Sequence, residues 1–123
     1  METVLICVAP EASYDLYELW HQQFHGAGWE AYVLPVTEVT TTELPPLAAV
    51  VAQATDWPED KLKEWLMAIR QAVGARRRLL ALLPQPPASY PAETQALWNH
   101  AFGYGAKLTD VVAIVNDFLA GNR

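Results

Sequence analysis

Two carboxylates, Glu11 and Asp56, follow apolar runs of strand length and are the side chains best suited to hold a ligand or a metal ion. Glu38 and Asp110 follow two further runs. The carboxyl ends of parallel strands share one edge of a sheet, where ligands bind, and Mg²⁺ takes carboxylate oxygens and water. The alternative is that Asp56 caps the next helix together with Glu59, and that Glu11 complements a helix dipole. The sequence favours these structural roles, so no metal site is assigned. Glu11 and Asp56 are kept as candidate ligand residues because they are the acids that would lie at the binding edge.

The turn after the first apolar run excludes the common nucleotide sites. It reads APEAS (residues 9–13) and lacks the glycines that dinucleotide-binding turns and phosphate loops need. No Gly-x-Ser-x-Gly nucleophile motif is present. The single cysteine, Cys7, lies within an apolar run, where a small core residue is expected. One cysteine also excludes a disulfide framework and a cysteine zinc site. We therefore predict no catalytic residue and no cofactor.

The composition is typical of one compact domain spanning residues 1–123. Apolar residues make up 52% of the chain and charged residues 18%, which excludes intrinsic disorder as the main state. The net charge of −6 argues against nucleic-acid binding, because phosphate contacts require a basic surface. No apolar run approaches the length of a membrane span and no targeting segment is recognisable, so we expect a cytoplasmic protein without membrane contact.

Apolar runs of strand length alternate with helical patterns. The runs cover residues 3–9, 30–36, 47–54 and 79–83, and a short fifth strand is expected at 104–108. Helices are expected at residues 13–24, at 57–73, from 91 through 102 and after 109. Continuous apolar strands belong to parallel sheets covered on both faces, so the pattern predicts an α/β three-layer αβα sandwich. The residues expected to be buried in its sheet are Val4, Ile6, Val50, Val51, Leu80 and Leu82.

The order of these elements resembles the receiver domain of response regulators, a flavodoxin-like fold of about this size. The best-matching segment is residues 101–108 (AFGYGAKL) with the amphipathic helix after it. A receiver has a Gly-Ala pair, a short strand, a lysine and its closing helix there. The resemblance covers most of the chain and implies a five-stranded parallel sheet of order 2-1-3-4-5.

The resemblance also gives positions for the residues of receiver phosphorylation. These positions hold Pro10 and Glu11 for the acidic pair, Ala52 or Gln53 for the phosphoacceptor aspartate, Leu83 or Pro84 for the Ser or Thr, and Lys107 for the lysine. Phosphotransfer requires the aspartate, so the resemblance implies a degenerate receiver, or pseudo-receiver, that is not phosphorylated on aspartate. Such domains typically act through protein contacts.

The connection after the second strand, residues 37–46 (TEVTTTELPP), is too short and too rich in Thr and Pro for the helix that normally covers this corner. With this second helix reduced, we expect a partly bare apolar surface that includes Leu44, Trp57 and Leu62. Bare aromatic surface is typical of an interface, here with a protein partner or a second copy of the chain. The alternative is that the Thr-rich loop folds down and covers this surface itself.

Three functional hypotheses follow. The leading one is a non-enzymatic, receiver-like interaction or regulatory module that works as a homo-oligomer or as a subunit of a larger assembly. The second is a small flavodoxin-like enzyme or ligand-binding protein that uses the acidic strand-end edge. The third is a toll/interleukin-receptor-like domain, which shares the alternating layout but whose catalytic glutamate has no assignable position here. The absence of a nucleophile, a phosphate loop or an acid–base pair favours the first.

Overall fold

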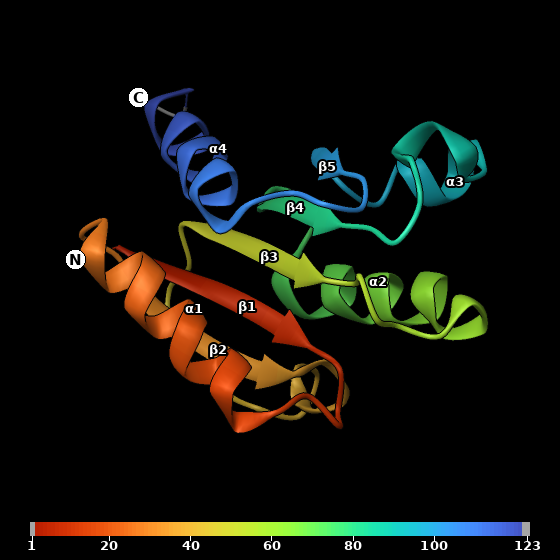
Figure 1. The fold of residues 1–123 in the computed structure, drawn as a ribbon. Coiled ribbons are helices and arrows are strands. Elements are labelled where there is room, and N and C mark those ends of the chain that lie inside the picture. The colour runs from red at the N-terminus through yellow and green to blue at the C-terminus, as the bar shows by residue number, and fades with distance from the viewer. Residues whose placement is uncertain (1, 122–123) are drawn as a thin grey trace.

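The computed structural model describes residues 2–121, with side chains through residue 118, and it contains one five-stranded parallel sheet (Figure 1). The strand order β2-β1-β3-β4-β5 is the order predicted from the sequence. The strands are β1 (Thr3–Val8), β2 (Glu30–Pro35), β3 (Ala49–Gln53), β4 (Arg78–Leu82) and β5 (His100–Phe102). The helices are α1 (Tyr14–Gly26), α2 (Glu59–Val73), α3 (Ala92–Gln95) and α4 (Leu108–Gly121), with 3₁₀ turns η1 (Val36–Glu38) and η2 (Pro87–Ser89). None of the described helices is long and apolar enough to cross a membrane.

Two hydrophobic cores lie on opposite faces of the sheet and make the predicted three layers. Helices α1 and α4 cover one face, while α2, the β2–β3 connection and the segment around α3 cover the other (Figure 1). On the α1 face, Trp20 and Phe24 are fully buried against the sheet. On the α2 face, Leu66 and Ile69 are fully buried. All six strand residues predicted to be buried are buried, namely Val4, Ile6, Val50, Val51, Leu80 and Leu82.

Helix α2 begins two residues later than predicted, and Asp56 does not cap it. Pro58 occupies the N-cap position with no side-chain cap, and its carbonyl oxygen accepts hydrogen bonds from the backbone N–H groups of Lys61 and Leu62. Proline suits this position because its extended backbone leads into the helix and it lacks an N–H that the helix would leave unpaired. The predicted capping pair of Asp56 and Glu59 is therefore wrong. Gly74 ends the helix, with a φ of 88°.

The last strand lies earlier in the chain than the sequence predicts. β5 is His100–Phe102, within the segment expected to be helical, and α3 is a single turn that ends at Gln95. The cause is a two-way link between Asn99 and Leu79: the backbone N–H of Asn99 donates to the Leu79 carbonyl, and the Leu79 N–H donates to Asn99 Oδ1, both at 2.8 Å. These bonds hold the chain against β4 before β5 begins. The expected strand at 104–108 is a turn into α4.

Arg70 ties the end of α2 to the segments that enter β4 and β5. Its Nε donates to the carbonyl oxygen of Leu97 at 2.7 Å, and its Nη1 donates to the carbonyl oxygens of Gly74 and Arg77 at 3.1 and 2.7 Å. Its Nη2 donates to Asn99 Oδ1 at 2.7 Å, the atom that also accepts from Leu79. One rigid guanidinium thus satisfies backbone and side-chain acceptors from two connections, α2–β4 and α3–β5, which a point-charge ammonium cannot do.

We expect Arg70→Lys to lower the free energy of unfolding by about 2 kcal/mol, because the ammonium leaves several of these acceptors without a donor. Urea denaturation followed by circular dichroism measures the change. The matched control is Arg76→Lys at an exposed loop position, with an expected change within about 0.5 kcal/mol. Equal stabilities of the two variants would contradict this role for the guanidinium.

Cys7, on β1, is fully buried, and burial raises the pKa of its thiol from 9.0 to about 12. Because the thiolate is the reactive species, native protein at pH 8 should not react with a chromogenic disulfide reagent, whereas the urea-unfolded chain should react completely. Between pH 9.0 and about 12 only the unfolded chain loses the proton, so this group lowers the free energy of unfolding as the pH rises through that range. Cys7→Ser, which has no thiol, is the control, and rapid labelling of the native protein would contradict the burial.

Candidate functional site

The carboxyl end of the sheet carries a small neutral hollow of about 350 Å³. Its lining includes Gln53, the half-buried last residue of β3, whose Nε2 donates to Thr55 Oγ1 at 2.7 Å. Tyr104, which is 83% exposed, stands at its rim. The lining residues are Leu16, Gln53, Thr55, Leu82, Tyr104, Gly105, Ala106 and Leu108, none of which carries a charge. The hollow therefore offers amide and hydroxyl groups with apolar walls, not carboxylates.

The predicted ligand residues Glu11 and Asp56 are exposed and do not line this hollow. Between residues 2 and 121, the structure brings together no group of three or more His, Cys, Asp or Glu side chains able to hold a metal ion. Glu38 does affect a neighbour at this edge: partial burial and then the Glu38 carboxylate raise the pKa of Tyr17 on α1. A ligand-binding role for Glu11 and Asp56 stays a prediction.

The receiver-like positions can now be placed in space. Ala52 is fully buried in the core on the α2 face, so Gln53 is the side chain that β3 presents at the strand-end hollow. Leu83 is buried, and its backbone N–H donates to the Phe102 carbonyl oxygen at 2.9 Å. Lys107 is exposed and lies directly before α4, where its carbonyl accepts from the first turn of that helix. Lys107 thus belongs to the start of a helix and not to the end of a strand.

The β2–β3 connection contains no second helix, as predicted, but the apolar surface beside it is not bare. The exposed fractions of Trp57 and Leu62 are 4% and 3%, because Val36, Val39 and Leu47 of the connection pack into the same core. Trp57 also packs edge-to-face on Trp65, with ring centroids 5.3 Å apart.

The expectation that Trp57 and Leu62 are partly exposed is therefore wrong, and the loop covers this surface itself. Their predicted role in an interface is untested, and both side chains are almost fully buried in the folded chain. Leu44 differs from them, because it is only half-buried at the surface of the same core.

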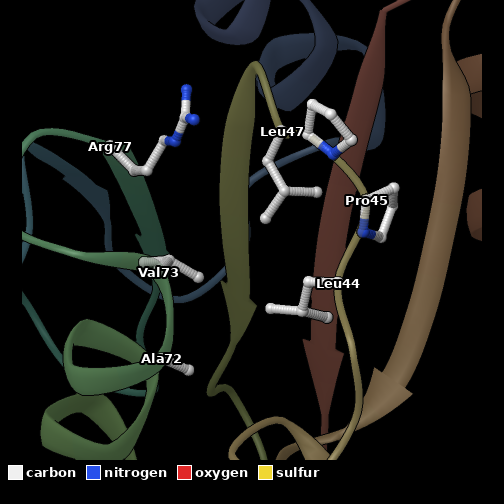
Figure 2. A pocket seen from close by; sticks show the side chains of 7 residues that line it. Leu44, Pro45, Leu47, Ala72, Val73 and Arg77 are labelled. Atoms are coloured by element: carbon white, nitrogen blue, oxygen red, sulfur yellow. The ribbon is translucent and has the colours of Figure 1, made fainter.

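Residues 43–46 (ELPP) form a ridge over the sheet, with a hollow on each side. The α2 groove, of about 370 Å³, is lined by Leu44, Pro45, Pro46, Leu47, Ala72, Val73 and Arg77. The β2 groove, of about 550 Å³, is lined by Thr3, Glu30, Tyr32, Glu43, Leu44, Pro45 and Pro46. Figure 2 shows the Leu44 side chain pointing toward Val73 and Ala72 of α2, while Pro45 points to the opposite side, toward β2. The ridge thus lies between the α2 groove and the β2 groove and forms one wall of each.

Charges of opposite sign lie at the two ends of this ridge. Glu43 begins it, and Arg77 lies beside its far end, near Leu47 (Figure 2). Both side chains belong to exposed residues, and neither takes part in the two salt bridges found among the described residues, Lys61–Glu64 and Lys63–Glu93. The middle of the ridge is apolar. This arrangement is a mixed surface with an apolar centre and charged ends, as in protein interfaces.

Sequence reasoning proposed Leu44 and the 37–46 segment for an interface, but it did not join them to Ala72 and Arg77. Arg77 stands in a basic run whose ordinary interpretation is a solvated loop, and Ala72 stands near the end of a helix. A local signal does exist in Pro45 and Pro46, which cannot donate backbone hydrogen bonds and so favour an extended, unpaired segment. No local signal places that segment against Arg77, because the contact joins distant parts of the chain.

No protein-family model matches this sequence, and no curated protein matches it. Solved structures do match. The response regulator receiver domain protein from Clostridium thermocellum superposes with a TM-score of 0.75 at 10% identity, over 99% of this chain and 97% of that one. The chemotaxis protein CheY4 of Vibrio cholerae gives 0.70 at 14% identity, over 97% and 99%. The adenylate cyclase from Rhodopirellula baltica gives 0.74 at 13% identity, over 97% of this chain and 87% of that one.

At identities this low, the likeness shows the fold and nothing further. The matches cover nearly the whole of this chain, and the strand order agrees with the topology that the resemblance implied. The chain has a response-regulator receiver-like α/β fold, with a parallel sheet of order 2-1-3-4-5.

Proposed function

We propose that this protein is a non-enzymatic, receiver-like interaction module whose strand-end site does not accept a phosphoryl group. The observation that carries the proposal is the position of Gln53. It is the last residue of β3 and faces the strand-end hollow, where the receiver resemblance puts the phosphoacceptor. The receiver-like fold supports this assignment.

The chemistry of Gln53 is opposite to that of an acceptor. A carboxylate attracts Mg²⁺ and attacks phosphorus with a charged oxygen, whereas an amide is neutral and weakly nucleophilic. Gln53 is also engaged with Thr55 at 2.7 Å, and the other residues that line the hollow are neutral. Without a charged cluster, the hollow has no means of concentrating Mg²⁺ or of balancing charge on a transferred phosphoryl group.

The proposed module acts by contact with a protein partner or with a second copy of the chain, and not with nucleic acid or a membrane. The net charge of −6 supports the exclusion of nucleic acid, because a polyanion would be repelled. The mixed surface around the ridge supports the protein contact, since it combines half-buried apolar side chains with flanking charges.

A second candidate function is ligand binding at the strand-end hollow. One observation favours it: the hollow is lined by apolar side chains together with a few amide and hydroxyl groups, the usual composition of a small-molecule site. The ligand would be small and neutral, since no lining residue provides a counter-charge. This differs from the acidic, metal-assisted site that the sequence suggested as an alternative.

Phosphorylation by acetyl phosphate and binding of beryllofluoride, both typical of receiver domains, test the main proposal. Incubation with acetyl phosphate and Mg²⁺ should leave the intact mass unchanged, because Gln53 presents no carboxylate. Titration with Mg²⁺ and beryllofluoride should leave the backbone amide resonances of Gln53 and Thr55 unshifted. The control is a variant with one carboxylate less at this edge, Glu11→Gln, which should behave as the wild type does. A phosphoryl adduct that is labile to alkali would contradict the proposal.

A further inference from the structure

The surface around the ridge is self-complementary. The ridge carries an acid at its first residue, Glu43, and an apolar Leu44 and Pro45 in its middle. The α2 groove beside it has apolar walls of Ala72 and Val73 and a base, Arg77, near the far end of the ridge (Figure 2). One surface of the protein therefore carries both the ridge and the groove beside it, together with one acidic and one basic side chain.

Two-fold symmetry would use these features together. In an isologous dimer the same patch faces itself in the opposite direction. Antiparallel alignment of two ridges brings the Glu43 end of each against the Arg77 end of the other, because the two charges lie at opposite ends. The apolar middle of each ridge then lies against the groove of the other copy.

The charge distribution favours a second copy over an unrelated acidic partner. Three of the eight basic residues of the chain lie together at Arg76, Arg77 and Arg78, while the chain as a whole carries −6. Another copy already presents the required acids, since Glu43 and Glu30 both line the β2 groove on the other flank of the ridge. Paired opposite charges at the ends of an apolar strip fix the register of an interface and reject wrong alignments.

We propose that two copies of this protein associate about a two-fold axis, with the 43–46 ridge of each copy in the α2 groove of the other. This inference rests on the proposed function, for which it names the partner. Pro45, which points away from its own α2, contacts Ala72 and Val73 of the other copy, Leu44 contacts the ridge of the other copy, and Glu43 faces its Arg77. The apolar contacts supply most of the association, and the two symmetry-related ion pairs set its direction.

The test is a charge exchange within one chain. Sedimentation velocity over a concentration series reaching about 0.5 mM should show the wild type shifting from monomer to dimer. Arg77→Glu and Glu43→Arg, each alone, should raise the dissociation constant by at least about tenfold, because each places like charges together twice in the dimer. The double variant should return to within about threefold of the wild type, since the pairs are restored with reversed sign.

Two further variants distinguish a contact made by the ridge and the α2 groove from a general effect of changing the charge of the protein. Arg76→Glu makes the same charge change at a neighbouring exposed residue that does not line the α2 groove, and it should change the dissociation constant by less than about threefold. Leu44→Asp should abolish association while circular dichroism stays that of the wild type. If Leu44→Asp fails to fold, the charge variants carry the test, since Glu43 and Arg77 are both exposed.

Failure of this inference can be told apart from failure of the proposed function. A wild type that stays monomeric, or a double variant no better than the single ones, overturns the self-association and favours a different protein on this surface. Neither result bears on phosphorylation, which the intact-mass experiment reports independently. A phosphoryl adduct in a protein that still forms the charge-dependent dimer would overturn the proposed function and leave the interface standing.

Discussion

A parallel sheet whose strands are apolar on both sides must be covered on both faces, and this constraint shapes the whole molecule. Here α1 and α4 cover one face, but the other face has one long helix, α2, and a single turn, α3. The β2–β3 connection must supply the missing cover. It does so by burying Val36, Val39 and Leu47, which leaves Glu43–Pro46 raised above the sheet between two grooves. The ridge is therefore a by-product of covering the sheet without a helix.

The sequence predicted the architecture because its strongest signals are local. Uninterrupted apolar runs located β1 to β4 within about two residues. The parallel arrangement followed from their alternation with helices, and the strand order followed from the receiver resemblance. The errors fall where contacts between distant residues decide the structure. Leu97 and Trp98 have helical spacing with Ala101, yet the link between Asn99 and Leu79 turns this stretch into the approach to a strand. Asp56 has cap chemistry, but Pro58 takes the N-cap position.

The candidate site was harder to predict than the fold, for a related reason. Leu44 was predicted as an interface residue because its ten-residue connection, which ends in Pro45 and Pro46, cannot form a full helix over this corner. The burial of Trp57 and Leu62 could not be predicted, since it depends on the path of a loop whose Thr-rich sequence prescribes no regular structure. At the strand ends, the sequence showed which acids follow each strand. It could not show that the hollow itself would be lined by neutral groups, with Gln53 among them and Glu11 outside it.

The two edges of the sheet also limit how this protein can aggregate. β5 is only three residues long, and β2, at the other edge, ends in Pro35, which has no backbone N–H to offer an incoming strand. Short and proline-terminated edges are poor templates for cross-β growth, in which chains add strand by strand. At high concentration, the protein is therefore not expected to form fibres by strand addition at its sheet edges. Association between folded copies then depends on side-chain contacts, which point mutations can strengthen or remove.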